Sequence, residues 1–145
     1  MKAALIVAGV VAFLGVSILV TRVLAADSRE RSDVIDLIAA QSRGDATEML
    51  RLLDGCGRDA RCRARVRENA ARLRRPGEIQ VLRFDPSTQW AFTGGENGAR
   101  IAWKTDRTTI PVVQCVTVRR TGDVLSGPGV ELVGLSGARG REAGC

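Results

Sequence analysis

Histidine and tyrosine are absent from this chain of 145 residues, and aromatic residues make up only 3% of it. Histidine is the commonest general base and the commonest metal ligand, so its absence removes most acid–base and metal-dependent active sites from consideration. The sequence also contains no glycine-rich phosphate loop, no Ser–His–Asp set and no paired-carboxylate motif. We therefore expect a protein that is not an enzyme, with no cofactor and no metal.

Lysine is nearly absent as well, since Lys2 and Lys104 are the only two. The net charge is +6, and all other basic residues are arginines. Nine arginines fall within residues 51–75, and the helix predicted there places Arg61, Arg65 and Arg72 on one face. A solvated helix face, a surface for anionic lipid, an anionic polymer or an acidic partner, and a nucleic-acid site all remain open. Nucleic acid is the least favoured of these, because no aromatic side chain lies nearby to stack on bases.

A long uncharged stretch occupies residues 3–21, between Lys2 and Arg22. A helix of this length measures about 28 Å, close to the roughly 30 Å of a bilayer core. We expect residues 1–26 to form a transmembrane signal-anchor, with residues 3–21 in contact with membrane lipid. The alternative is a signal peptide cleaved after Ala25 or Ala26, which would make the protein secreted. The length of the apolar stretch and the charge of Arg22 favour an uncleaved anchor.

The side of the membrane on which the remaining residues lie is predicted in opposite ways by two features. Arg22, Arg29, Arg31 and Arg43 favour the cytoplasm by the positive-inside rule. Four cysteines in a small domain behind a secretory-type segment are instead typical of two disulfides in an oxidising compartment. We give the cysteines more weight and expect a single-pass protein of the cytoplasmic membrane with an extracytoplasmic domain at residues 27–145.

The four cysteines are Cys56, Cys62, Cys115 and Cys145, and they allow three pairings. Five residues separate Cys56 from Cys62, which is more than in usual zinc sites or in a Cys-x-x-Cys redox motif. We therefore expect structural disulfides, and proximity favours Cys56 with Cys62 and Cys115 with Cys145.

Hydrophobic periodicity predicts helices followed by strands. Helical spacing covers about residues 29–43, 45–54 and 58–75, and the first of these can run on from the anchor. Strand patterns follow at about residues 78–84, 88–93, 99–105, 110–120 and 129–136, and we expect the sequence GGENG at residues 94–98 to form a hairpin loop. This grouping predicts an α+β domain, with about three helices packed on a curved antiparallel sheet of four to five strands.

The stretch VIDLIAAQSRGDATEMLRLLDG, residues 34–55, predicts a helix, the pair Gly44–Asp45 and a second short helix. This arrangement resembles the first helical hairpin of the nuclear-transport-factor-2-like (cystatin-like, cone-shaped) superfamily, and the resemblance covers about residues 32–137 at the level of architecture. It implies a cone-shaped fold. Many members are membrane-anchored envelope proteins or periplasmic domains of secretion systems that bind partners, whereas enzymatic members place His, Asp or Tyr inside the cone.

Four polar or aromatic residues in otherwise apolar strands form a candidate pocket: Trp90, Trp103, Gln114 and Glu131. Glu131 would there act as an acid or base in a small-ligand-binding domain or enzyme. The alternative is that the tryptophans belong to the core and Glu131 lies on a solvent face. Because no catalytic set accompanies these residues, we expect a non-catalytic interaction or assembly module of a bacterial cell envelope, whose partner is an unknown envelope protein.

Overall fold

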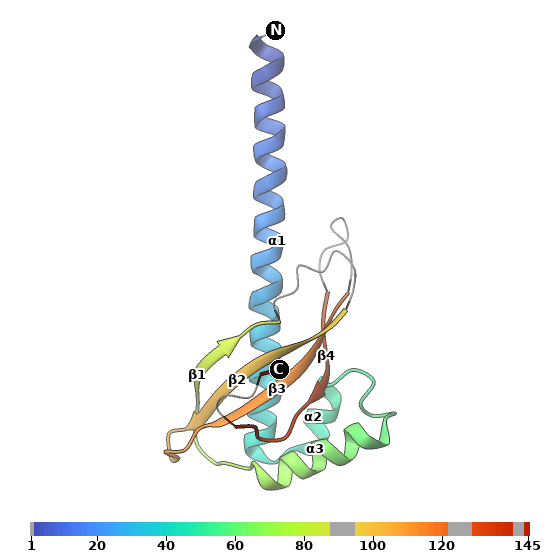
Figure 1. Cartoon of the computed structure of the whole chain (residues 1–145), viewed down its shortest axis with the longest axis vertical. Coiled ribbons are helices and arrows are strands. Elements are labelled where there is room, and N and C mark those ends of the chain that lie inside the picture. Colours follow the sequence, from blue (N-terminus) through green and yellow to red (C-terminus); the bar gives the residue numbers. More distant parts are fainter. Residues whose placement is uncertain (1, 88–94, 122–128, 141–143) are drawn as a thin grey trace.

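The computed structural model describes residues 2–87, 95–121, 129–140 and 144–145, so the expected strand at 88–93 and Trp90 lie outside the described residues (Figure 1). Helices α1 (Lys2–Arg43), α2 (Ala46–Leu52) and α3 (Ala60–Arg72) come first in the chain. They are followed by strands β1 (Ile79–Asp85), β2 (Gly95–Thr105), β3 (Val112–Thr121) and β4 (Gly129–Leu135). The strands form one antiparallel sheet in the order β1-β2-β3-β4, which confirms the predicted α+β class.

Helix α1 joins the predicted anchor and the first predicted domain helix into one unbroken helix of 42 residues. At about 1.5 Å per residue it is roughly 63 Å long. It ends at Gly44, whose φ of +78° is a left-handed conformation that glycine adopts without strain. Asp45 then caps α2 by accepting a hydrogen bond from the backbone N–H of Glu48 at 3.0 Å.

The domain half of α1 packs on one face of the sheet. Val34, Leu37 and Ile38 of α1 are fully buried in the same cluster as Ile101 and Trp103 of β2. Residues on neighbouring strands alternate in register, with Ala99 opposite Val116, Ile101 opposite Gln114 and Trp103 opposite Val112. These side chains therefore point to the same, helix-covered face, and the alternate residues point to the outer face.

Helix α3 lies at the end of the domain that is farthest from the N-terminus of α1 (Figure 1). The backbone N–H of Arg75, just after α3, donates to the carbonyl of Ser42 near the end of α1. The side-chain amide of Asn69 donates to the carbonyl of Ser136 at 2.9 Å, after β4. These contacts hold α3 against both layers of the domain.

The expectation that residues 94–98 form a hairpin loop is wrong, because Gly95–Gly98 are the first residues of β2 and pair with Thr117–Arg120 of β3. Glycine at position 98 serves a close approach instead of a turn. A Cβ atom there would lie 2.6 Å from the Cβ of Cys145, so the C-terminal residues can cross the strand only over a glycine. The helices predicted at 45–54 and 58–75 are also shorter than expected.

Candidate functional site

The N-terminal half of α1 exposes its apolar side chains. Ten large apolar residues between Ile6 and Leu24 are 50–71% exposed, and they are Ile6, Val7, Val10, Val11, Phe13, Leu14, Val16, Ile18, Val20 and Leu24. By length and composition this is a helix that can cross a membrane, and a signal sequence has the same properties. Exposed apolar side chains around a whole helix require an apolar environment, so this segment is the first candidate functional feature.

The exposed segment changes into a packed one without any break in the helix. Ala26 is already buried, and Val34 is fully buried in the core two turns later. A continuous α-helix is a stiff connection, because every backbone N–H inside it is bonded to the turn before. The position of the folded domain relative to the apolar segment is therefore set by α1 itself.

Charged groups join α1 to the sheet where the helix enters the domain. Glu30 of α1 is fully buried, and its carboxylate accepts hydrogen bonds from the backbone N–H and hydroxyl of Ser87 at 2.7 and 2.8 Å. Arg120 of β3 donates to Glu30 at 2.7 Å and to Asp27 at 2.8 Å. Burial alone would lower the pKa of Arg120, but its bonds to the two carboxylates outweigh this effect and raise the pKa. We call Asp27, Glu30, Ser87 and Arg120 the helix–sheet clamp.

A polar network in the core absorbs two residues of the candidate pocket. The indole N–H of Trp103 donates to Gln114 at 2.9 Å, and Gln114 exchanges hydrogen bonds with Gln41 of α1 at 2.8 and 3.1 Å. Gln114 also donates to the carbonyl of Ser136 at 3.0 Å. All three side chains are fully buried, and the network links α1, β2 and β3. Trp103 and Gln114 are thus part of the core.

Glu131, the other described member of the candidate pocket, lies elsewhere. It is opposite Arg119 in the β3–β4 register, on the outer face of the sheet, and its carboxylate is 3.6 Å from the Arg119 guanidinium. Arg119 also contacts Glu96 at 2.7 Å and Asp54 at 3.6 Å, and its hydrogen bond to Glu96 raises its pKa. Because the sheet separates Glu131 from Trp103, these residues do not line a common pocket.

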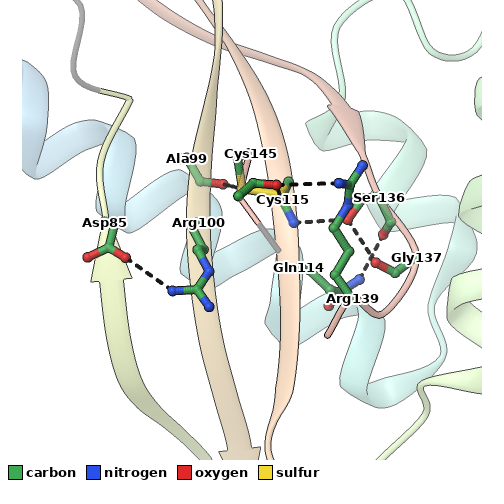
Figure 2. Close-up of a disulfide and its surroundings, with 10 residues drawn as sticks. Asp85, Ala99, Arg100, Gln114, Cys115, Ser136, Gly137, Arg139 and Cys145 are labelled. Carbon is green, nitrogen blue, oxygen red and sulfur yellow. Dashed lines mark hydrogen bonds and ion pairs between the residues drawn. A yellow bond between two sulfur atoms is a disulfide. The ribbon is translucent and has the colours of Figure 1, made fainter. Parts of the chain in front are cut away.

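Two disulfides join the cysteines in the pairing that proximity favoured. Cys56–Cys62 closes the turn between α2 and α3, with 5.3 Å between the two Cα atoms. Cys115–Cys145 ties the C-terminal residue to the central strand β3, with 5.6 Å between the two Cα atoms. Figure 2 shows the second disulfide beside Ser136, whose hydroxyl accepts from the backbone N–H of Cys115 at 2.9 Å. Both bridges therefore fasten segments that have no strand or helix of their own.

An open groove of about 580 Å³ lies beside the second disulfide. Its lining includes Glu96, Thr117, Gly134 and Arg139 together with the Cys115–Cys145 bridge. Carboxylate, guanidinium and hydroxyl groups are mixed there, and this mixture does not select one class of small ligand. Across the described residues, no group of three or more Cys, Asp or Glu side chains is arranged to hold a metal ion.

Helix α3 carries the three arginines that the sequence predicted on one face, but two of them form ion pairs within the helix. Arg65 and Arg72 both contact the carboxylate of Glu68, at 3.0 and 3.1 Å. Arg61 is exposed, and its backbone N–H donates to the capping carboxylate of Asp59 at 2.7 Å. The buried side of the helix is formed by Val66, Asn69 and Ala70.

The helix–sheet clamp was not predicted from the sequence. Asp27 and Glu30 are three residues apart just after the apolar stretch, and this spacing on one helix face was a readable signal of a shared cationic partner. Their partner Arg120 is 90 residues beyond Glu30, so no local pattern could identify it.

Comparison of the chain with protein-family models, with curated proteins and with solved structures finds no match.

Proposed function

We propose that this chain is a membrane-tethered, non-catalytic interaction module whose folded domain lies on the extracytoplasmic side of a bacterial cytoplasmic membrane. The observation that carries the proposal is the continuity of α1, whose exposed apolar half runs directly into the half that is packed on the sheet. An anchor without a linker presents the domain at a set height and orientation. Such an arrangement suits a protein that must meet an envelope partner at a defined distance from the membrane.

We also propose that the anchor is retained. Cleavage after Ala25 or Ala26 would require local unwinding of α1 at a point where Ala26 is buried and Asp27 is bonded to Arg120. The free energy needed to open the helix–sheet clamp therefore opposes proteolysis once the domain has folded.

The two disulfides support the extracytoplasmic side, because such bridges form and persist in oxidising compartments. Membership of the nuclear-transport-factor-2-like superfamily stays a prediction, supported here only by helices that precede an antiparallel meander. A ligand pocket built from Trp103 and Glu131 is not proposed again, since the two side chains lie on opposite faces of the sheet.

Three readouts on the full chain, expressed in a bacterium and extracted from its membranes, test the proposal. Intact-mass spectrometry should give the uncleaved chain, and loss of residues 1–25 or 1–26 would contradict the retained anchor. Protease added to spheroplasts should degrade the domain, and protection until lysis would place the domain in the cytoplasm. Non-reducing peptide mapping should find Cys56 linked to Cys62 and Cys115 linked to Cys145, whereas four alkylated thiols would contradict an oxidising location.

A further inference from the structure

The strongest concentration of charge in the domain surrounds α3. Residues 58–75 contain eight arginines against two carboxylates, Asp59 and Glu68. Neither carboxylate is free, because Asp59 caps the helix N-terminus and Glu68 is shared by Arg65 and Arg72. We call residues 58–75 the distal basic surface, and the described residues of the domain do not neutralise its excess of positive charge.

Four of the eight arginines already have a hydrogen-bond or ion-pair partner within the domain. Arg65 and Arg72 contact Glu68, Arg63 donates to the carbonyl of Gly57 at 2.7 Å, and Arg75 donates to the carbonyl of Ile110. The other four are exposed and form no side-chain hydrogen bond or ion pair within the described part of the chain, and they are Arg58, Arg61, Arg67 and Arg74. These four guanidinium groups are available to an external anion.

The exposed side of α3 carries small side chains between two arginines. By helical periodicity, Arg61 lies on one shoulder of the exposed side and Arg67 on the other. Ala64 and Ala71 lie between the shoulders and are exposed, and the one carboxylate on this strip, Glu68, is held by Arg65 and Arg72. At about 1.5 Å per residue α3 is roughly 20 Å long, which is room for several anionic groups of an extended polymer.

The membrane that holds the anchor is too far away to be the anionic partner. From Arg22, at the end of the uncharged stretch, to Ser42, which contacts the residues after α3, the helix rises about 30 Å. Figure 1 shows α3 at the opposite end of the domain from the apolar segment. Electrostatic attraction is screened over about 8 Å at physiological ionic strength, so headgroups of that membrane do not reach the distal basic surface.

The chemistry of the surface also distinguishes between partners of other classes. Protein interfaces normally centre on buried apolar or aromatic anchors, and the exposed large apolar residues of the described domain outside α1 are only Leu82 and Ile110. Nucleic acids without duplex structure are held by stacking on aromatic side chains, and α3 contains none. Guanidinium groups alone suit carboxylate or phosphate groups, which they bind in a bidentate manner.

We propose that the distal basic surface binds an extended anionic polymer, which lies along α3 between Arg61 and Arg67 and runs about 30 Å from the membrane surface. The position of the polymer relative to the membrane rests on the proposed function. Binding itself depends only on the four free arginines, so it can be measured whichever side of the membrane the domain occupies.

The test uses the full chain in uncharged nanodiscs, with fluorescently labelled long-chain polyphosphate and poly-L-glutamate as probes in separate titrations. The variant replaces Arg61 and Arg67 with Gln, and a matched control replaces Arg29 and Arg31 of α1, which are also exposed and lie outside the distal basic surface. If four contacts release counterions as on single-stranded polyanions, affinity of the unmodified chain should fall about 50-fold between 50 and 200 mM salt. The variant keeps two of the four contacts, so its affinity should fall only about 7-fold over the same range, and the control should keep the roughly 50-fold change.

Several results would overturn the proposal. Equal loss of binding in the variant and the matched control would mean that only net charge matters, and absence of binding to either probe at 50 mM salt would mean a solvated helix face. Tighter capture of anionic vesicles than of either polymer would identify a second lipid surface as the partner. Far-ultraviolet circular dichroism and intact disulfides establish that each variant is folded, and a failed topology experiment would leave the polymer result unaffected.

Discussion

Replacing Arg120 with methionine removes the cation from the helix–sheet clamp and leaves a buried carboxylate on α1. Glu30 is fully buried, and the side chain of Arg120 is only 16% exposed. Removing one partner of a buried ion pair costs about 3–5 kcal/mol, because the other charge stays desolvated without compensation. The two hydrogen bonds from Ser87 remain, so we expect the lower end, about 3 kcal/mol. This is a large part of the roughly 5–15 kcal/mol that holds a domain folded.

The matched control is Arg119→Met, in the neighbouring position of the same strand. Arg119 has more carboxylates around it than Arg120, but its side chain is 40% exposed, and solvent screens exposed ion pairs so that they add little to stability. Urea denaturation of the full chain in mild detergent, followed by circular dichroism, should therefore separate the two variants by about 2 kcal/mol or more.

A double-mutant cycle with Glu30→Gln identifies the cause of the loss. Glutamine removes the charge while keeping an acceptor for Ser87. The double variant Glu30→Gln/Arg120→Met should therefore lose about 1–3 kcal/mol less unfolding free energy than the sum of the losses of the two single variants. If Arg120→Met costs no more than Arg119→Met, or if the two clamp substitutions are additive, Glu30 is hydrated and the reasoning is refuted.

Other substitutions test the remaining parts of the argument. Three glycines inserted after Arg22 should leave the urea midpoint unchanged. They should broaden the distribution of distances between the bilayer surface and a fluorophore attached in place of Ala64, measured by energy transfer, and an unchanged distribution would contradict a stiff connection. Cys145→Ser should lower stability by up to about 3.7 kcal/mol and Cys62→Ser by about 2.4 kcal/mol, because the first bridge closes the longer loop, and the reverse order of the two unfolding free energies would contradict this. Burial and then the charge of Asp36 raise the pKa of Asp33, so ionised Asp33 disfavours folding at neutral pH. Asp33 is partly exposed, so solvent screens this effect. Asp33→Asn should therefore raise the free energy of unfolding by no more than about 0.5 kcal/mol at pH 7 and by almost nothing near pH 3, where Asp33 is mostly protonated in both states, and an equal gain at both pH values would exclude titration as the cause.

The fold class and element order could be predicted because they depend on local periodicity. Apolar side chains at helical spacing identified the domain half of α1, and Gly44 and Asp45 marked the end of one helix and the start of the next. Gly95 and Gly98 were misread as loop residues because a glycine in a strand and a glycine in a turn look alike in a sequence. Only the packing of Cys145 against Gly98 explains that glycine.

The candidate site was less predictable because its contacts join distant residues. Gln41 and Gln114 are 73 positions apart, and the sequence around either residue gives no sign that they form a pair. For this reason Gln114 was expected in a pocket, although it belongs to the core. Two of the three arginines chosen on α3 share the single carboxylate of Glu68, and this was readable, since Glu68 is three residues from Arg65 and four from Arg72. The arginines without an internal partner can be identified only when the partners of the other arginines are known.

The disulfides carry a further argument about the side of the membrane. The entropy of the two loops corresponds to about 2.4 and 3.7 kcal/mol, which together approach the whole stability expected of a small domain. In a reducing compartment the domain would have to fold without this contribution, and the C-terminal residues would lose the bond that holds them over Gly98. The positive-inside rule acts only during insertion and counts basic residues in short loops within about 15–20 residues of the span. The arginines of the distal basic surface are farther from the span and are therefore not counted. Folding free energy therefore favours the extracytoplasmic side proposed here.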